Sequence, residues 1–389
     1  MKQVNVLNRP PCLPSSVRGM AVLLLMIMFC WMEGSLQAQD DVKVKSVTPD
    51  GKGDITFTPG FRVQIRYQND QADKNNDFFI NRLRLKGGGN VYGLAKYYFE
   101  VKIDGAGRFN RQPRAQVENA WLNFPVNDGL AIRVGLYDMV FSRNALTSDS
   151  KLLLMDRSLI KGALTVLGIA DNTVGILAHG RPLAGKLTYG FGIFDNIGFE
   201  IAGSDLDGTV TRQSDGAMTT GRLAYDFLDP AKPGGYGDYR SSYLGQGKRL
   251  TIGVNAAYLS KAQIQDREFT LIAYGFDAFF NYGPFVLEAE YDAYKEDDKV
   301  SGAADINGDG WYAQAGVMVH PRIELAARYQ QLEPDDSNRG DIAKWTSLGG
   351  NYYLRSHNLK VQADYTIRKE EGDNEVSNDL IRVQLQFDF

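Results

Sequence analysis

The chain ends with Ile381-Arg382-Val383-Gln384-Leu385-Gln386-Phe387-Asp388-Phe389, in which every odd position is apolar and every even position is polar. Successive side chains of a β-strand point to opposite faces, so this alternation gives a strand with one apolar face and one polar face. A strand between lipid and water requires that pattern, although a strand of a soluble sheet can also show it. The fold therefore depends on how often the pattern recurs.

Further stretches alternate in the same way from residue 54 onward, for example 61–67, 82–86 and 359–368. Most of them are roughly ten residues long, the length that a tilted strand needs to cross a bilayer. Together they predict sixteen strands, with bounds near 54–67, 77–87, 92–104, 114–124, 130–138, 173–181, 186–194, 217–228, 248–259, 268–281, 285–295, 310–319, 322–332, 343–354, 358–369 and 379–389.

The connections alternate between tight turns, such as 125–129 and 282–284, and longer polar loops, such as 195–215. Short turns at one end and long loops at the other are typical of bacterial outer-membrane barrels. The Pro/Gly-rich stretch 229–247 is an exception, because it is long but falls at the short-turn end. A soluble β-sandwich is the alternative, but its strands are shorter. We therefore predict an all-β protein, a 16-stranded antiparallel transmembrane β-barrel.

The N-terminus has the layout of a secretory signal peptide. Basic residues precede an uncharged apolar run at 20–32, and a small residue, Ala38, offers a cleavage point. We expect a signal peptide at 1–38, a periplasmic leader at 39–53 and the barrel at 54–389, in the outer membrane of a Gram-negative bacterium. A buried helix or a membrane anchor is the alternative interpretation. Both cysteines, Cys12 and Cys30, fall in the signal peptide, which leaves the mature chain without thiol chemistry.

One segment resembles the phosphate-selective porin O and P family. It comprises Gly135–Ser142 (GLYDMVFS), then Leu146–Ser148 (LTS) and Asp156–Ser158 (DRS). The stretches 78–85, 174–180 and 189–196 resemble the family's second strand and the hairpin after the loop. The resemblance covers nearly all of the mature chain. It implies a homotrimeric, anion-conducting pore that is narrowed by an inward-folded third external loop, here 142–172.

A pore needs a width and a ring of charge rather than reaction chemistry, so we expect no enzyme activity and no cofactor. The alternation points several cations of the early strands into the lumen: Arg62, Arg66, Arg82, Arg84 and Arg133, together with Lys86, Lys96 and Lys102. Arginine suits phosphate because its planar fork donates two parallel hydrogen bonds. The resemblance further implies that Arg62, Arg82, Ser148 and Arg157 lie at the constriction. Alternatively, these cations only hydrate the pore and pair with Glu100, Glu118 and Asp104.

Asp149 follows Ser148, and a carboxylate in a constriction repels phosphate. We therefore predict an outer-membrane porin for passive diffusion of small hydrophilic solutes, with a preference for anions. Phosphate or polyphosphate conduction is the narrower candidate. The formal net charge of −4 argues against nucleic-acid binding. Two other classes stay open: a barrel-type outer-membrane enzyme, and a structural or adhesive barrel without a transport role. The enzyme would need a Ser/His/acid set near the rim, whereas the three histidines fall near predicted short turns.

Asp305, Asn307 and Asp309 match the first half of a calcium-binding loop, but Gly316 stands where the closing glutamate is required. A polar turn is the favoured interpretation, and we expect no metal. The remaining expected partners are outer-membrane lipid, small anions such as phosphate, and the barrel-assembly machinery. Phe389 resembles the C-terminal aromatic signal that this machinery recognises.

Overall fold

The computed structural model describes residues 44–47, 54–71, 75–108, 114–195, 200–201, 210–214, 216–230, 239–264, 267–298, 305–336, 342–371 and 378–389. They belong to one compact unit, Lys43–Phe389. The predicted signal peptide lies outside the described residues. No helix within these ranges is both long enough and apolar enough to cross a membrane.

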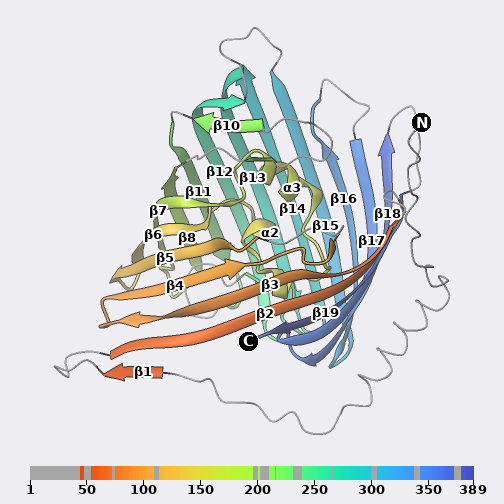
Figure 1. The fold of residues 1–389 in the computed structure, drawn as a ribbon, viewed down its shortest axis with the longest axis horizontal. Coiled ribbons are helices and arrows are strands. Elements are labelled where there is room, and N and C mark those ends of the chain that lie inside the picture. Colours follow the sequence, from red (N-terminus) through yellow and green to blue (C-terminus); the bar gives the residue numbers. More distant parts are fainter. Residues whose placement is uncertain are drawn as a thin grey trace, which may run out of the picture. The chain divides into compact units, whose positions relative to one another are not determined.

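Sixteen antiparallel strands close into a barrel within the described part of the chain (Figure 1). They are β2 (Asp54–Asp70), β3 (Asn75–Val91), β4 (Ala95–Lys102), β5 (Gln116–Asn127), β6 (Leu130–Asp138), β7 (Asn172–Gly180), β8 (Leu187–Phe194), β11 (Met218–Asp226), β12 (Lys248–Ile264), β13 (Arg267–Tyr282), β14 (Phe285–Asp298), β15 (Ile306–His320), β16 (Ile323–Glu333), β17 (Ile342–Arg355), β18 (Leu359–Glu371) and β19 (Leu380–Asp388). The predicted fold class and all sixteen predicted strands are confirmed.

The last strand pairs with the first and closes the ring. The register between β19 and β2 runs from Leu380 opposite Asp70 to Asp388 opposite Arg62. Beyond it, the Phe61 amide donates to the Phe389 carbonyl at 2.9 Å, and the Phe389 amide donates to the Phe61 carbonyl at 3.0 Å. The terminal aromatic residue is therefore part of the closing seam. Closure matters because a free strand edge would leave unpaired backbone groups in lipid.

Three short strands were not predicted. β1 (Val44–Val47) pairs with the start of β2, so part of the expected leader is a strand. β9 (Glu200–Ile201) and β10 (Val210–Ser214) pair with each other between β8 and β11, and β10 also pairs with β12. Segments of two to five residues are too short for an alternating pattern to be recognised.

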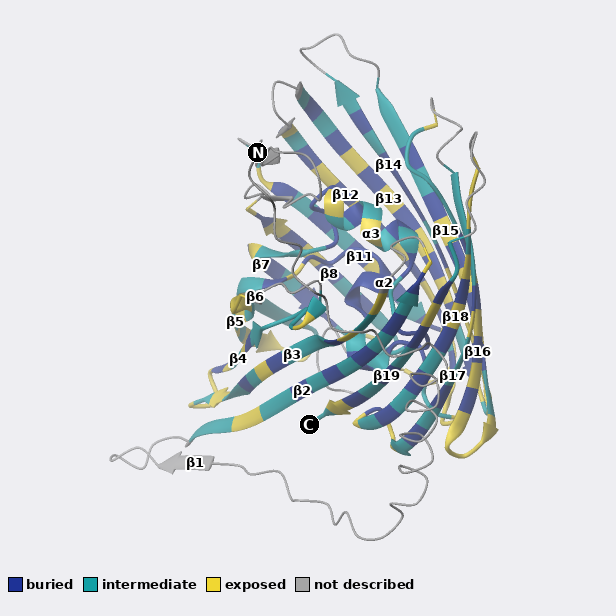
Figure 2. Ribbon diagram, turned by 45° about the vertical axis from the view of Figure 1, so that its right-hand side comes forward, coloured by how far each residue is buried: buried dark blue, intermediate teal, exposed yellow. Residues whose placement is uncertain are grey.

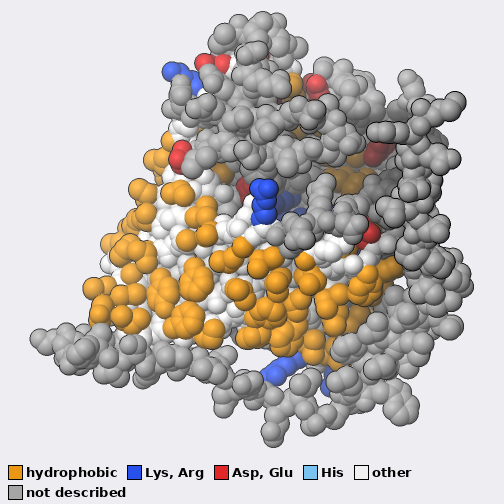
Figure 3. Space-filling model, in the orientation of Figure 1, with side chains coloured by type: hydrophobic (Ala, Val, Ile, Leu, Met, Phe, Trp, Pro, Cys, Tyr) orange, Lys and Arg blue, Asp and Glu red, His pale blue; other side chains and the backbone are white. Residues whose placement is uncertain are grey.

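Burial in the barrel is inverted relative to a soluble protein. On β19, Arg382 and Gln384 are 4% and 1% exposed, whereas Ile381 is 45% exposed. The same alternation of buried and exposed positions runs along many strands in Figure 2. Hydrophobic side chains dominate the outer face of the lower strands in Figure 3. The polar positions therefore face inward and the apolar positions outward, as the C-terminal sequence predicted.

Part of the inner face of β12 and β13 breaks this rule, because it is apolar. Leu259, Phe269 and Leu271 are each about 1% exposed and belong to one buried cluster. The outer face of β13 is also apolar, with Ile272 and Tyr274 exposed. Both faces are apolar here because protein rather than water covers the inner one.

The segment that covers this inner wall is residues 139–171, called the first insert, between β6 and β7. It contains α2 (Arg143–Leu146), η2 (Asp149–Lys151) and α3 (Leu159–Val166). Phe141 and Leu164 are fully buried and pack in the same cluster as Phe269 and Leu271. Figure 1 shows α2 and α3 within the ring of strands. The first insert therefore packs against the inner wall of the barrel.

A second segment, residues 239–247, also lies inside the barrel and is called the second insert. Its Ser241 amide donates to the Lys151 carbonyl of the first insert at 3.1 Å. Its Ser242 hydroxyl donates to the Glu324 carboxylate on β16 at 2.6 Å. Ser241 and Ser242 are at most 2% exposed. Within the long stretch at the short-turn end of the barrel, Ser241 and Ser242 therefore fill lumen space.

Candidate pore constriction

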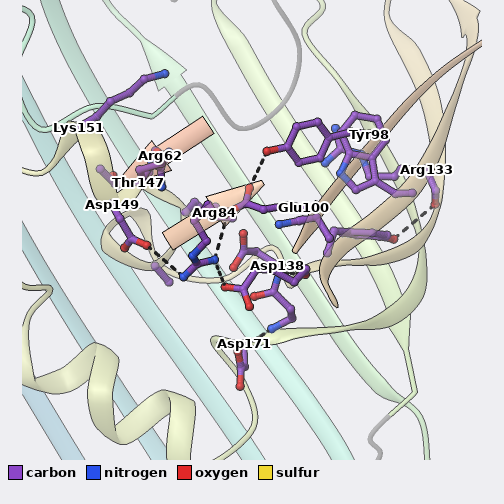
Figure 4. Close-up of a pocket in the computed structure, with 18 of the residues that line it drawn as sticks. Arg62, Arg84, Tyr98, Glu100, Arg133, Asp138, Thr147, Asp149, Lys151 and Asp171 are labelled. Carbon is purple, nitrogen blue, oxygen red and sulfur yellow. Dashed lines mark hydrogen bonds and ion pairs between the residues drawn. The ribbon is translucent and has the colours of Figure 1, made fainter. Parts of the chain in front are cut away.

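The first insert leaves a polar cavity of about 480 Å³ between itself and the wall formed by β2–β7. Charged side chains dominate its lining among the described residues. Seven are cationic and five are carboxylates: Arg62, Arg84, Lys96, Arg133, Lys151, Arg157 and Lys161, with Glu100, Glu118, Asp138, Asp149 and Asp171. Figure 4 shows Arg62, Arg84 and Asp149 grouped at one side of this cavity and Arg133 at the other.

The first insert is anchored to the wall opposite this cavity. The backbone amide of Asn144 donates to the Glu290 carboxylate on β14 at 3.0 Å. The backbone amide of Leu159 donates to the side chain of Gln330 on β16 at 3.0 Å. The Asn351 amide group on β17 donates to the Leu153 carbonyl at 2.9 Å. These contacts, with the apolar cluster, seat the insert against β12–β17 and leave the open space beside the arginine-rich strands.

Arginines from two strands and from the insert converge on residues 148–150 of the first insert. The Arg62 guanidinium on β2 donates to the hydroxyls of Ser148 at 3.1 Å and Ser150 at 3.2 Å. Arg82 on β3 lies 2.9 Å from the Asp149 carboxylate, and Arg157 forms a second ion pair with the same group. The structure therefore brings together the four positions that the family resemblance assigned to the constriction.

Carboxylates compensate much of this positive charge. Arg84 pairs with Asp104 at 2.7 Å, with Glu118 at 2.9 Å and with Glu100 at 3.1 Å. Lys102 also pairs with Glu118, at 2.5 Å. The pairing that we considered as the alternative for the lumen cations is therefore present for Arg84 and Lys102.

Arg66 and Arg133 have different surroundings. Arg66 pairs with Asp156 of the first insert at 3.0 Å. Neither Arg66 nor Arg82 is among the described residues that line the cavity. The Arg133 guanidinium lies over the Trp121 ring, 4.2 Å from its centre. Of the seven predicted site residues, Arg62, Arg66, Arg82 and Arg84 lie on strands beside the first insert, Ser148 and Arg157 belong to it, and Arg133 stands apart on β6.

Two cavity cations on the first insert, Lys151 and Lys161, were not predicted. Burial, and then the nearby positive charge of Arg157, lower the pKa of Lys161 to about 8. The sequence offers only a weak signal for these two lysines, which is that they are basic residues within the segment expected to fold inward. Neither lysine belongs to a predicted strand or to the motifs that resemble the family.

The predicted calcium-loop residues do not converge on one point. Asp305 pairs with Lys295 at 2.9 Å, and the Asp309 carboxylate accepts from the Tyr291 hydroxyl at 3.2 Å. Asn307 and Asp309 lie on strand β15, where same-face residues stand about 6.6 Å apart, so the expected polar turn is not formed there. No group of three or more acidic, His or Cys side chains among the described residues is arranged to hold a metal.

The three histidines lie at the short-turn end, as expected. His179 ends β7 and bonds the Asn123 side chain at 2.6 Å, and His320 ends β15. His357 lies in the turn between β17 and β18 and bonds the Ser242 backbone carbonyl at 3.0 Å.

Comparisons with known proteins agree with this architecture. The anion-selective porin from Comamonas acidovorans superposes with a TM-score of 0.60 at 14% identity, over 86% of this chain and 100% of that one. The trimer form of OmpT, an outer membrane protein of Vibrio cholerae, superposes with a TM-score of 0.58 at 12% identity, over 86% and 99%. An uncharacterized protein of Aquifex aeolicus (strain VF5) is 26% identical over 388 residues, which is 91% of each chain. The family model described as phosphate-selective porin O and P matches residues 57–389. The chain therefore belongs to that family, and it is an outer-membrane porin.

Proposed function

We propose that this porin prefers anions and passes small anionic solutes, phosphate among them, through the cavity beside the first insert. The observation that carries the proposal is the lining, in which seven cationic side chains face five carboxylates among the described residues. A cavity of this volume is about 8 Å across, comparable to the Debye length at physiological salt. Charges on its walls therefore act on an ion anywhere in the passage.

Charge neutralisation in the cavity tests this proposal. Arg62→Gln removes one cavity cation, and Arg355→Gln removes an exposed arginine at the end of β17. We expect Arg62→Gln to shift the single-channel reversal potential in a KCl gradient toward cation preference. Arg355→Gln should leave it unchanged. Equal effects of the two variants would show that the cavity charge does not set selectivity.

We also infer a homotrimer. Strands β4 and β8 contain eight residues, and β6, β7 and β11 contain nine. At about 3.3 Å per residue and a tilt of about 45°, such strands rise about 20 Å, less than the roughly 25 Å apolar band of a barrel. A neighbouring protomer on this side would relieve the mismatch with lipid. A trimeric mass of the protein in mild detergent, measured by light scattering, would support the inference, and a monomeric mass would contradict it.

The assignments at the chain ends remain proposals. We propose a cleaved signal peptide at 1–38, a periplasmic leader at 39–53, and location in the outer membrane of a Gram-negative bacterium. N-terminal sequencing of the membrane-inserted protein should begin near residue 39. We further propose that the protein has no enzyme activity. Purified protein should therefore lack phospholipase and protease activity, and either activity would favour the barrel-type enzyme instead.

A further inference from the structure

Asp149 differs from the other carboxylates of the cavity in its surroundings. Its side chain, 10% exposed, is approached by three guanidinium groups. Arg82 lies at 2.9 Å, Arg84 at 3.9 Å, and Arg157 forms a closer ion pair. These arginines come from β3 and from the first insert itself. A carboxylate among three arginines has the surroundings that an oxyanion would have in a binding site.

Guanidinium groups are suited to such a site because each offers a planar set of donors that matches two oxygens of a carboxylate or a phosphate. The neighbouring donors are of the same kind, since Arg62 holds the hydroxyls of Ser148 and Ser150 on either side of Asp149. The cluster therefore contains the donors for a mobile oxyanion. Its occupant is a group of the chain itself.

We propose that Asp149 is a specificity-determining residue, whose carboxylate takes the place of a mobile oxyanion in the cluster of Arg82, Arg84 and Arg157. The inference rests on the proposed anion preference and deepens it. A tethered carboxylate competes with dissolved anions at a high effective concentration. Phosphate must displace it before it can engage these arginines. The pore consequently passes small anions without retaining phosphate.

The first insert has several anchors besides Asp149. Glu290, Gln330 and Asn351 hold its backbone from the opposite wall. The apolar cluster around Phe141 and Leu164 packs it against β12 and β13. Asp149→Asn keeps the size of the side chain and removes its charge. We therefore expect this variant to keep the insert in place and to release the arginines.

The test compares Asp149→Asn with Asp171→Asn. Asp171 lines the same cavity, but its carboxylate accepts a hydrogen bond from the Asn172 amide at 2.8 Å. Both variants remove one negative charge from the cavity. Inorganic phosphate is added to single channels conducting chloride, and the phosphate concentration that halves the current is measured. We expect this concentration to fall about fivefold in Asp149→Asn, the change for one lost competing ion pair, and much less in Asp171→Asn.

A second variant keeps the inference falsifiable if Asp149→Asn perturbs the insert. Adding Arg82→Gln to Asp149→Asn should return the phosphate concentration that halves the current to its wild-type value, because one of the guanidinium groups that would bind phosphate is lost. Two results would overturn the inference. One is equally strong phosphate block in Asp149→Asn and Asp171→Asn. The other is phosphate block that stays stronger than in the wild type after Arg82→Gln is added to Asp149→Asn. The proposed function is judged separately, from the sign of the wild-type reversal potential in KCl.

Discussion

Replacing Leu164 with alanine tests whether the first insert is a packed wall of the pore rather than a loosely held loop. Leu164 lies on α3, is fully buried, and belongs to the apolar cluster that contains Phe269 and Tyr312 of the barrel wall. Truncating a buried leucine costs about 2–5 kcal/mol. The barrel strands are held by their own ladders, so this cost should fall mainly on local opening of the insert. Each 1.4 kcal/mol is about a factor of ten, so opening should become about 30-fold to a few thousand-fold more frequent.

Amide hydrogen exchange followed by mass spectrometry measures this opening in the detergent-solubilised protein. Peptides that cover Leu159–Val166 should exchange faster in Leu164→Ala by that factor, while peptides from β16 and β18 should not change. Val166→Ala is the matched control, because Val166 is on the same helix and 47% exposed. Its expected effect is below about 0.5 kcal/mol. Equal exchange of α3 in the two variants would refute the packed-wall account.

Three other predictions concern charge, lumen volume and assembly. Lys161 loses its proton as pH rises through about 8, so anion preference should fall over that range. Lys161→Arg should abolish this pH dependence because arginine stays charged. The same pH dependence in Lys161→Arg as in the wild type would contradict the role of Lys161. Deleting residues 239–244 removes buried lumen volume and should raise single-channel conductance; an unchanged conductance would show that the second insert does not limit flow. Deleting Phe389 removes both backbone hydrogen bonds to Phe61 and should lower the amount of heat-resistant barrel in cell membranes. Arg355→Gln serves as the control. A wild-type amount of heat-resistant barrel without Phe389 would argue against a role of Phe389 in assembly.

The barrel itself could be predicted from the sequence, because lipid outside and water inside impose a period of two. On β18 and β19 this pattern is complete, and the predicted bounds differ from the observed ones by no more than two residues. On β12 and β13 the first insert covers part of the inner wall, so residues such as Leu271 face protein, and both strand faces are apolar at those positions. The alternation of apolar and polar residues reflects what each strand face contacts. At these positions the inner face contacts protein and not water.

The site could be predicted as a set of residues but not as a set of contacts. Strand parity predicts an inward position for Arg62 and Arg84, which line the cavity, because parity depends only on local backbone geometry. The partners of Asp149 depend on how far the first insert reaches across the barrel, which no local pattern encodes. The second insert was missed for a related reason. The Pro/Gly-rich composition of the whole stretch 229–247 is typical of a surface loop, whereas the Ser241 amide and the Ser242 hydroxyl have hydrogen-bond partners inside the lumen.

Ion selectivity of the wild-type channel tests the central claim most directly. Single channels of the full-length mature protein are recorded in a planar bilayer between two KCl concentrations. The cavity has more cationic than carboxylate side chains, so we expect the reversal potential to have the sign of the chloride equilibrium potential. A reversal potential of the sign set by potassium would contradict the account.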